Sequence, residues 1–531
     1  MFRKLTVLFT LLVMVAVAAP AALAQEPVIL RYPISPDPEH LNPFTATTIA
    51  IGTINRNIYE GLTRLDLTTG EPLPGLAESW EISDDHLTYT FKLRQGVMFH
   101  DVAGIEWENG DREFKADDWI WSAHIYASPD ETISKHPESV EGIVGLEEFV
   151  AGEADSISGL VALDDYTLQV QLTAPNRLFF TVGPGTVSVV PREAYEQLDN
   201  FANNPVGTGP FMFVEWLKDD HITLTANPEY WDEGYPLVDG VRFINVADAN
   251  TELLMYRQDE LDFVFRFPPG QLAAVAEEFA DEYSELPGLN VRYFGFDMAQ
   301  GLFAENPPLR KAFAHAFNRE LVWDELMEGA RFPATLGVLP PLMPASEPSI
   351  TYPYDLDRAA ELLAEAGFPN GEGLPPIQLY VFATAKDELS FPVLQDDLRK
   401  LGVTLEIVIE DNATYWSHIG EEDVLMFLSG WSAGIPDPSD VMNFLFMAGR
   451  DDTHYDNPEV NALLQAAMSE FDYDARIALY EQAHDLIMED CPVIVSAYSK
   501  VTWLQKPGVS GFEPGGGGTY TAPLYKVSLG G

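Results

Sequence analysis

A serine between two glycines is the first feature of this sequence that could carry chemistry. Residues 430–434 read GWSAG and match G-x-S-x-G, the pattern that places a nucleophilic serine on a sharp turn in α/β-hydrolases. The turn needs a strand before the serine and a helix directly after it. Residues 424–428 (VLMFL) are apolar enough for the strand, but Pro436 and Pro438 follow, and we expect no helix to start there.

The remaining parts of a hydrolase site are hard to find. Asp440, His454 and His484 follow Ser432 at unremarkable spacings, and no HGGG-like oxyanion segment precedes it. A secreted serine hydrolase that uses Ser432 is therefore a remote alternative, and we predict that the protein is not an enzyme. No phosphate-binding loop, H-E-x-x-H motif or CxxC pair is present, so we predict no cofactor and no metal site.

Aromatic residues near predicted turns are better candidates for a function. Tyr59, Trp416 and Trp431 are among them, and aromatic faces with a few polar groups are how clefts hold small organic ligands. Packing in the core is the alternative for each. Trp431 favours a ligand wall, because glycines and prolines surround it and we expect a loop there after a buried strand.

The composition describes an acidic globular chain. Its 531 residues carry a formal net charge of −53, and 46% of them are hydrophobic. Such a surface repels phosphate backbones, so we predict no nucleic-acid partner. The single cysteine, Cys491, leaves no internal disulfide, so the fold must be held by its core.

The amino terminus has the pattern of a secretory signal peptide. Arg3 and Lys4 precede an apolar run that ends in Ala22-Leu23-Ala24, so we predict a signal peptide over residues 1–24 that is cleaved before Gln25. No other stretch approaches the about 18 consecutive apolar residues of a spanning helix. We therefore predict an exported protein.

Strands and helices alternate along the chain. Half-buried strands are predicted by the alternation in LTYTFKLRQGVMF, YTLQVQLTAP and HITLTANP. Helical periodicity predicts helices in PPLRKAFAHAFNRELVWDELMEG, DLDRAAELLAEAGF, FPVLQDDLRKLGV and NALLQAAMSEFDYDARIALYEQAHDLIMED. The fold class is therefore α/β or α+β with mixed sheets.

Several segments, taken in order, resemble one family. These are PEHLNPF, IYEGLTRLD, GLAESWEISDDHLTYTFKLRQGVMFHD, FKADDWIWSA, VGTGPFMFVEW, LTANPEYWDEGYPLVDGVRF and NPPLRKAFAHAFNRELV. From Leu30 to its end the chain is similar to the extracellular solute-binding proteins, family five, of peptide- and nickel-uptake ABC transporters.

The resemblance implies an α/β, two-lobed periplasmic-binding-protein fold of type II, in its large cluster C form, with mixed sheets and an inserted subdomain. The first lobe is expected to be discontinuous, over residues 25–294 plus 496–531, with the inserted subdomain at about 63–189. The second lobe is expected over residues 295–495. RYFGFDM and VIVSAYSK are the expected hinge crossings, and Asp297 stands where the family usually has asparagine in the first of them.

The resemblance also implies a ligand-binding loop at GWSAGIPDP. Peptide-binding members carry an aspartate there that pairs with the peptide's amino terminus, and this chain has Gly434 at that position. Either Asp437, or Glu60 from the other lobe, replaces that carboxylate, or the ligand has no amino terminus. Ser432 is then a small residue of the loop.

Taken together, the expected ligand contacts are Asn42, Tyr59, Glu60, Asp297, Trp416, Trp431, Ser432, Ala433, Gly434 and Asp437.

Two ligand classes stay open. The family's usual role favours peptides, whereas Gly434 and the many aromatics favour an oligosaccharide or another neutral solute. Nickel is a distant third, because no histidine lies near the loop. The expected partners are an ABC permease and its ATPase, and the protein is expected to be a periplasmic monomer without a lipid-anchor cysteine.

Overall fold

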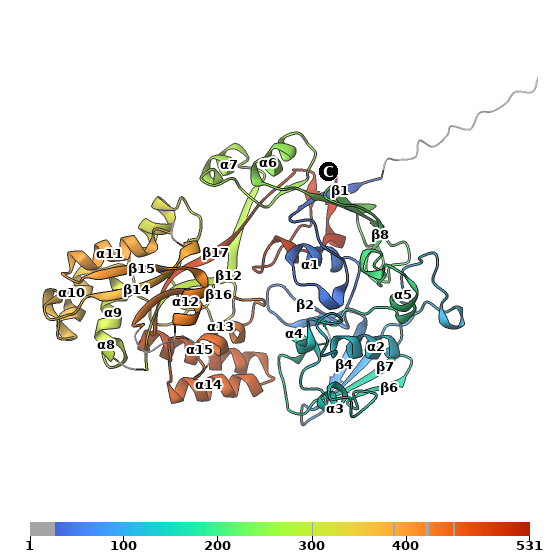
Figure 1. Cartoon of the computed structure of the whole chain (residues 1–531), viewed down its shortest axis with the longest axis horizontal. Coiled ribbons are helices and arrows are strands. Elements are labelled where there is room, and N and C mark those ends of the chain that lie inside the picture. The colour runs from blue at the N-terminus through green and yellow to red at the C-terminus, as the bar shows by residue number, and fades with distance from the viewer. Residues whose placement is uncertain are drawn as a thin grey trace, which may run out of the picture.

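Two long antiparallel strands connect the two halves of the molecule (Figure 1). They are β12 (Tyr283–Phe296) and β17 (Val493–Gln505). This computed structural model describes residues 27–183, 185–299, 301–385, 388–419, 424–449 and 452–530. The predicted signal peptide, residues 1–24, lies outside these ranges.

The two strands bend where they pass from one half to the other. Their register shifts between Pro287 and Val291 and again between Arg292 and Tyr293, which marks β-bulges. A bulge bends its strand and increases the local twist. The change of direction between the two halves is therefore built into β12 itself.

The first lobe contains two four-stranded sheets. One has the order β1-β10-β9-β8, with β1 and β10 parallel, and the other is the antiparallel sheet β4-β5-β7-β6. Their strands are β1 (Ile29–Ile34), β8 (Phe211–Leu217), β9 (His221–Ala226), β10 (Gly240–Asn245), β4 (Ala77–Ile82), β5 (Thr88–Leu93), β6 (Leu160–Asp164) and β7 (Thr167–Gln171). Short pairs are β2 (Thr63–Leu65) with β3 (Pro72–Pro74) and β18 (Val509–Ser510) with β19 (Ser528–Leu529). The helices are α1 (Ile49–Asn55), α2 (Ala116–Tyr126), α3 (Leu146–Val150), α4 (Phe179–Val182), α5 (Arg192–Gln197), α6 (Ala249–Arg257) and α7 (Leu272–Glu278).

The second lobe is built on a mixed sheet. Its order is β11-β17-β12-β16-β14-β15, and β13 also pairs with β17. The remaining strands are β13 (Phe332–Pro333), β14 (Ile377–Phe382), β15 (Leu405–Glu410) and β16 (Met426–Ser432). β11 (Phe263–Val264) pairs with the other end of β17, and its Phe263 packs in the core of the first lobe. Its helices are α8 (Gly301–Ala304), α9 (Pro307–His315), α10 (Leu356–Glu365), α11 (Ser390–Lys400), α12 (Asn412–His418), α13 (Pro438–Leu445), α14 (Pro458–Ser469) and α15 (Tyr473–Asp490).

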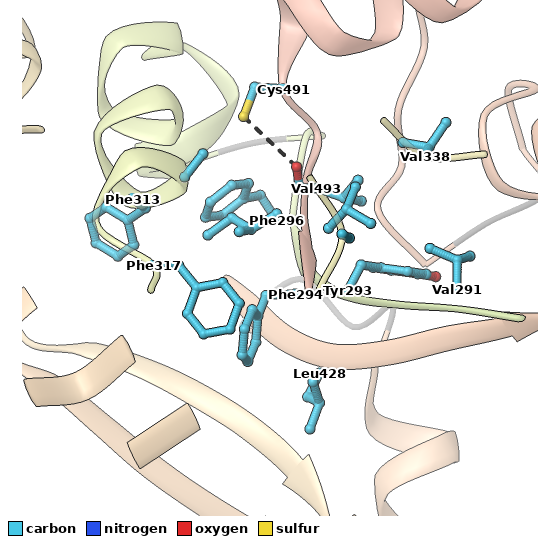
Figure 2. Close-up of a cluster of buried hydrophobic side chains, with 14 of the residues drawn as sticks. Val291, Tyr293, Phe294, Phe296, Phe313, Phe317, Val338, Leu428, Cys491 and Val493 are labelled. Carbon is cyan, nitrogen blue, oxygen red and sulfur yellow. Dashed lines mark hydrogen bonds between the residues drawn. The ribbon is translucent and has the colours of Figure 1, made fainter. Parts of the chain in front are cut away.

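Each half has its own apolar core. The core of the second lobe runs from Leu289 to Tyr498 and gathers around β12, as Figure 2 shows for Phe294, Phe296 and their neighbours. Phe294 meets Phe317 edge-on, with ring centroids 5.4 Å apart. The core of the first lobe includes residues from Leu30 to Phe263, Trp503 from β17 and apolar residues of the tail from Val509 to Val527. The exact lobe boundaries at 294/295 and 495/496 stay a prediction.

Most of the predicted elements are confirmed. Strands β5, β7 and β9 and helix α10 lie within the segments whose periodicity predicted them, and α11 begins one residue before its predicted segment. The helix predicted from residue 461 to 490 is two helices, because α14 ends at Ser469 and Asp472 then caps α15 by accepting the amide of Ala475. The segment from Pro307 likewise ends its α-helix at His315, and a π-helical turn follows at Leu321–Leu326.

The single cysteine is a core residue. Cys491 is buried, and burial raises the pKa of its thiol to about 11. Within the described ranges, no helix combines the length and apolar character needed to cross a membrane.

A buried histidine gives the second lobe a pH-dependent stability. Nε2 of His484 accepts the amide of Val338 at 2.9 Å, and Nδ1 contacts the Ala345 carbonyl at 2.8 Å, where it donates. Burial lowers the pKa of this ring to about 4. Below about pH 6.5 the histidine therefore binds a proton in the unfolded chain but not in the folded protein. Its contribution to the free energy of unfolding is complete above pH 6.5 and is lost as the pH falls towards 4.

We expect His484→Gln to lose less free energy of unfolding than the wild type between pH 6.5 and 4, by about 3 kcal/mol from a shift of this size. Urea unfolding at a series of pH values measures both slopes. The variant will be less stable at pH 7, because it loses buried hydrogen bonds, so the slopes are compared and not the absolute values. Equal slopes would show that His484 does not carry this dependence.

Candidate functional site

The GWSAG segment lies at the carboxyl edge of three neighbouring strands. β14 runs parallel to both β15 and β16, so the connections after all three strands meet at one edge of the sheet. Ligands of open α/β sheets bind outside the carboxyl ends of such strands. We expected Trp431 in a loop, but it belongs to β16, where it lies opposite Val291 of β12.

One carboxylate shapes the loop that follows β16. Oδ2 of Asp440 accepts the amides of Gly434 at 2.7 Å and Ile435 at 3.2 Å, and Oδ1 accepts the indole N–H of Trp431 at 2.9 Å. The ring of Trp431 also stacks on Phe444, with centroids 4.8 Å apart. The loop and its tryptophan are therefore fixed by contacts within the lobe. A carboxylate has about four acceptor positions, so one remains on Oδ1.

The second carboxylate of the loop is buried in an ion pair. Asp437 is 4% exposed and caps α13 by accepting the Ser439 amide at 2.9 Å. Its other oxygen pairs with Nη1 of Arg476 at 2.7 Å. Removing one partner from a buried pair leaves an uncompensated charge. The Asp437 carboxylate is thus engaged inside the protein.

The helix after the loop corrects one expectation. α13 begins at Pro438, and we were wrong to expect that the prolines prevent a helix start, because proline suits the first helical position. Ser432 nevertheless ends a strand, and the loop separates it from the helix, so the sharp elbow is missing. Asp440 holds the loop, His454 contacts Asp297, and His484 is buried, so none of these three candidates forms a recorded contact with Ser432.

Glu60 of the first lobe is also fully engaged. Its carboxylate accepts from Nη2 of Arg64 at 2.9 Å, Tyr230 at 3.0 Å, Trp231 at 3.0 Å and Thr208 at 3.1 Å. Four donors fill the acceptor positions of a carboxylate. In this arrangement Glu60 organises its own lobe.

Three other predicted residues make local contacts. Asn42 caps a short 3-10 helix by accepting the Phe44 amide at 3.1 Å. Tyr59 is 4% exposed, and burial raises the pKa of its hydroxyl well above the usual value. Asp297 is buried and accepts from Nδ1 of His454 at 3.1 Å. None of the three lies with Trp431 in a contact that the structure records.

Trp416 forms an exposed aromatic ledge at the same edge of the sheet. It is 51% exposed and stacks on Phe382, the last residue of β14, with centroids 5.7 Å apart. The guanidinium of Arg292 lies 4.7 Å from the Phe382 ring and pairs with Glu388 at 2.8 Å. This exposed ring, together with the partly exposed Trp431, gives the edge apolar surface beside charged groups.

Sequence reasoning missed five residues as parts of this edge: Arg292, Phe382, Glu388, Phe444 and Asp440, which it had considered only as a hydrolase acid. Two of them carried a readable signal. Arg292 interrupts the apolar run of a buried strand, and Asp440 stands at the third position of a helix that opens with Asp-Pro. The others have ordinary types at ordinary positions.

This fold and edge define a two-lobed solute-binding protein. The chain belongs to the bacterial extracellular solute-binding proteins, family 5, whose middle-region model matches residues 71–452. The glutathione-binding protein GsiB of Salmonella paratyphi A is 27% identical over 514 residues, which cover 94% of each chain. The predicted family and the two-lobed fold are confirmed, and these relatives are binding proteins.

Solved structures share this two-lobed fold. The unliganded open form of the periplasmic murein tripeptide binding protein MppA gives a TM-score of 0.84 at 21% identity, covering 95% of this chain and 98% of that one. DppA from Helicobacter pylori, in complex with the peptide STSA, gives 0.64 at 27% identity, covering 95% and 98%. Both comparisons show the same two-lobed fold, and the chain superposes better on MppA than on DppA.

We expect Asp440→Asn to loosen the loop, because one amide oxygen cannot accept both the Trp431 indole and the two backbone amides. Hydrogen exchange at Gly434 and Ile435 should rise about tenfold, the factor that corresponds to about 1.4 kcal/mol of lost protection. Asp474→Asn, in the exposed first turn of α15, is the matched control. Unchanged exchange in Asp440→Asn would contradict the clamp.

Proposed function

We propose that this protein captures peptides between its lobes and delivers them to an ABC permease and its ATPase. The observation that carries the proposal is the aromatic, charge-flanked edge around Trp431, in a chain matched over 94% of its length by a glutathione-binding protein. Glutathione is itself a small peptide, and DppA holds the peptide STSA. Trp431, Ser432, Ala433, Gly434 and Trp416 are the proposed contacts of the second lobe.

The ligand's ammonium group needs a carboxylate near Gly434. Asp437 and Glu60, the two residues named from the sequence, are already paired with Arg476 and Arg64. A Cβ atom on Gly434 would lie 3.7 Å from Oδ2 of Asp440. We therefore assign the anchoring charge to Asp440, whose Oδ1 keeps a free acceptor position.

Four further residues are proposed to support the site without touching the ligand: Asn42, Tyr59, Glu60 and Asp297. Glu60 fixes the segment after α1 through its four donors, and Asp297 holds His454 beside the end of β12. The burial of Tyr59 and Asp297, and the hydrogen bonds that already occupy the side chains of Asn42 and Glu60, support a positioning role over direct contact with the ligand.

An oligosaccharide or another neutral solute is the second candidate. It is favoured by the 51% exposure of Trp416 and by Gly434, which leaves the family's usual carboxylate position empty. Flat exposed rings stack well on sugar faces. Peptides are favoured by the free acceptor position on Asp440 and by the relatives, which include a glutathione-binding protein and DppA in complex with the peptide STSA.

We further propose that the protein is exported to the periplasm and acts there as a monomer, without enzymatic activity and without a nucleic-acid partner. The formal net charge of −53 supports the last point, because it repels phosphate. The family's extracellular role supports export.

Thermal unfolding with a ligand panel tests the ligand class. We expect tri-alanine or glutathione to stabilise the protein, by about 2.7 kcal/mol at one hundred times the dissociation constant, and maltotriose or cellobiose to leave it unchanged. N-acetyl-tri-alanine should bind more weakly than tri-alanine, because it has no ammonium group for Asp440. Stabilisation by the sugars alone would overturn the peptide proposal.

A second test separates binding from hydrolysis. Ser432→Ala should keep its affinity for the stabilising ligand within a few-fold, since the side chain is small and ends a strand. Neither the wild type nor the variant should hydrolyse p-nitrophenyl acetate above the buffer rate. An esterase rate that Ser432→Ala abolishes would establish the hydrolase alternative instead.

A further inference from the structure

The predicted inserted segment, residues 63–189, touches the second lobe beside the ligand loop. Gly70, in the turn between β2 and β3, has a φ of +72°, and a Cβ atom there would lie 3.4 Å from the carbonyl oxygen of Pro436. The same atom would lie 3.7 Å from Cβ of Asp437. The tip of this hairpin therefore lies so close to the end of the loop that any side chain in place of Gly70 would touch it.

An arginine of the second lobe holds charged groups from both sides. Arg476, on α15, is 1% exposed and pairs with Asp437 of its own lobe through Nη1 at 2.7 Å. Its Nη2 lies 3.5 Å from Oε1 of Glu71, the residue after Gly70. Glu71 is in turn paired with Arg177 of the inserted segment. A series of charged side chains, Asp437, Arg476 and Glu71, thus connects the ligand loop to the other lobe.

A second contact joins the same two parts of the molecule. The ring of His86, in the turn between β4 and β5, stacks on Phe471 with centroids 3.7 Å apart and planes 7° apart. Phe471 lies just before α15, the helix that carries Arg476. The inserted segment therefore meets the start of α15 at two places.

The ion pair between the lobes is incomplete in this arrangement. At 3.5 Å the distance from Arg476 to Glu71 exceeds the 2.7–3.2 Å of ordinary N–H···O hydrogen bonds. Nε of Arg476 is buried and has no hydrogen-bond partner. A buried donor without a partner is unfavourable, and arginine reaches its best geometry when two of its N–H groups meet one carboxylate.

We propose that Glu71 and Arg476 form a closure contact, and that Arg476 is a positioning residue that couples the ligand loop to the movement of the lobes. When the lobes rotate together, the Glu71 carboxylate moves onto Nε and Nη2 of Arg476. The pair is then stronger in the closed state, so it shifts the population towards closure. Because Arg476 also holds Asp437, the loop around Trp431 is held while the lobes close. This device does not depend on which solute is bound.

Single-molecule fluorescence transfer between the lobes tests the closure contact without a ligand. Dyes are placed through Ala151→Cys beside α3 and Ala360→Cys on α10, both exposed, while the native Cys491 stays buried and unlabelled. In Glu71→Gln we expect the ratio of closed to open molecules to fall about threefold, the size of a partly exposed ion pair. High salt should shrink this difference.

Three variants separate the closure contact from other effects of the substitution. Glu78→Gln, an exposed acid on β4 without an ion pair in the structure, is the matched control and should leave the ratio unchanged. Arg177→Gln removes the other partner of Glu71 and should retain most of the closed population. Arg476→Lys keeps the positive charge but cannot donate two N–H groups to one carboxylate. In that background, Glu71→Gln should therefore lower the ratio of closed to open molecules by less than it does in the wild type.

An unchanged or increased closed fraction in Glu71→Gln would overturn the proposal, and so would an equal fall in Glu78→Gln or Arg177→Gln. Titration of the labelled protein with glutathione and tri-alanine is a separate arm. If neither peptide raises the closed fraction of the wild type, the peptide proposal fails, while the ligand-free comparison still decides the closure contact.

Discussion

The antiparallel pairing of β12 with β17 is the interaction on which the rest of the structure depends. The two strands, of 14 and 13 residues, carry side chains into the cores of both lobes. β12 also pairs along its other edge with β16, so Val291 lies between Trp431 on one side and Tyr498 on the other. A change in the bend of β12 is therefore transmitted by backbone hydrogen bonds to the strand that carries the candidate ligand wall.

The acidity of the chain sets a second constraint, because 83 acidic residues face only 30 basic ones. A buried carboxylate needs a cation or several hydrogen-bond donors as partners, and several of the few arginines in this chain serve as such partners. Asp437 is paired with Arg476, and Glu60 is paired with Arg64. These two carboxylates are therefore already neutralised within the protein. Buried acids are for this reason poorer ligand candidates here than Asp440, which is partly exposed and keeps an acceptor position.

Periodicity and end signals predicted many of the elements, and they failed where a residue has two explanations. Gly430 was interpreted as a turn signal, but a Cβ atom there would lie 2.7 Å from the carbonyl oxygen of Val291, so the glycine is required by close strand packing. The strand continues through it, and Trp431 is part of the sheet. The break between α14 and α15 was missed because the apolar spacing continues across Asp472, whose role as a cap needs no change of periodicity.

The candidate site was harder to predict than the fold, because its partners are far apart in the sequence. Glu71 and Arg476 are 405 positions apart, and with so many acids present no spacing between an acid and an arginine carries information. The resemblance placed an absent carboxylate at Gly434, and the structure places Asp440 with its Oδ2 3.7 Å from where a Cβ of residue 434 would be. Asp440 occupies the first turn of α13, where a helix favours negative charge and where the loop amides need an acceptor. The amides of the loop therefore need a carboxylate beside Gly434 whether or not a ligand is bound. In the proposed complex, the ammonium group of the ligand would pair with this same carboxylate.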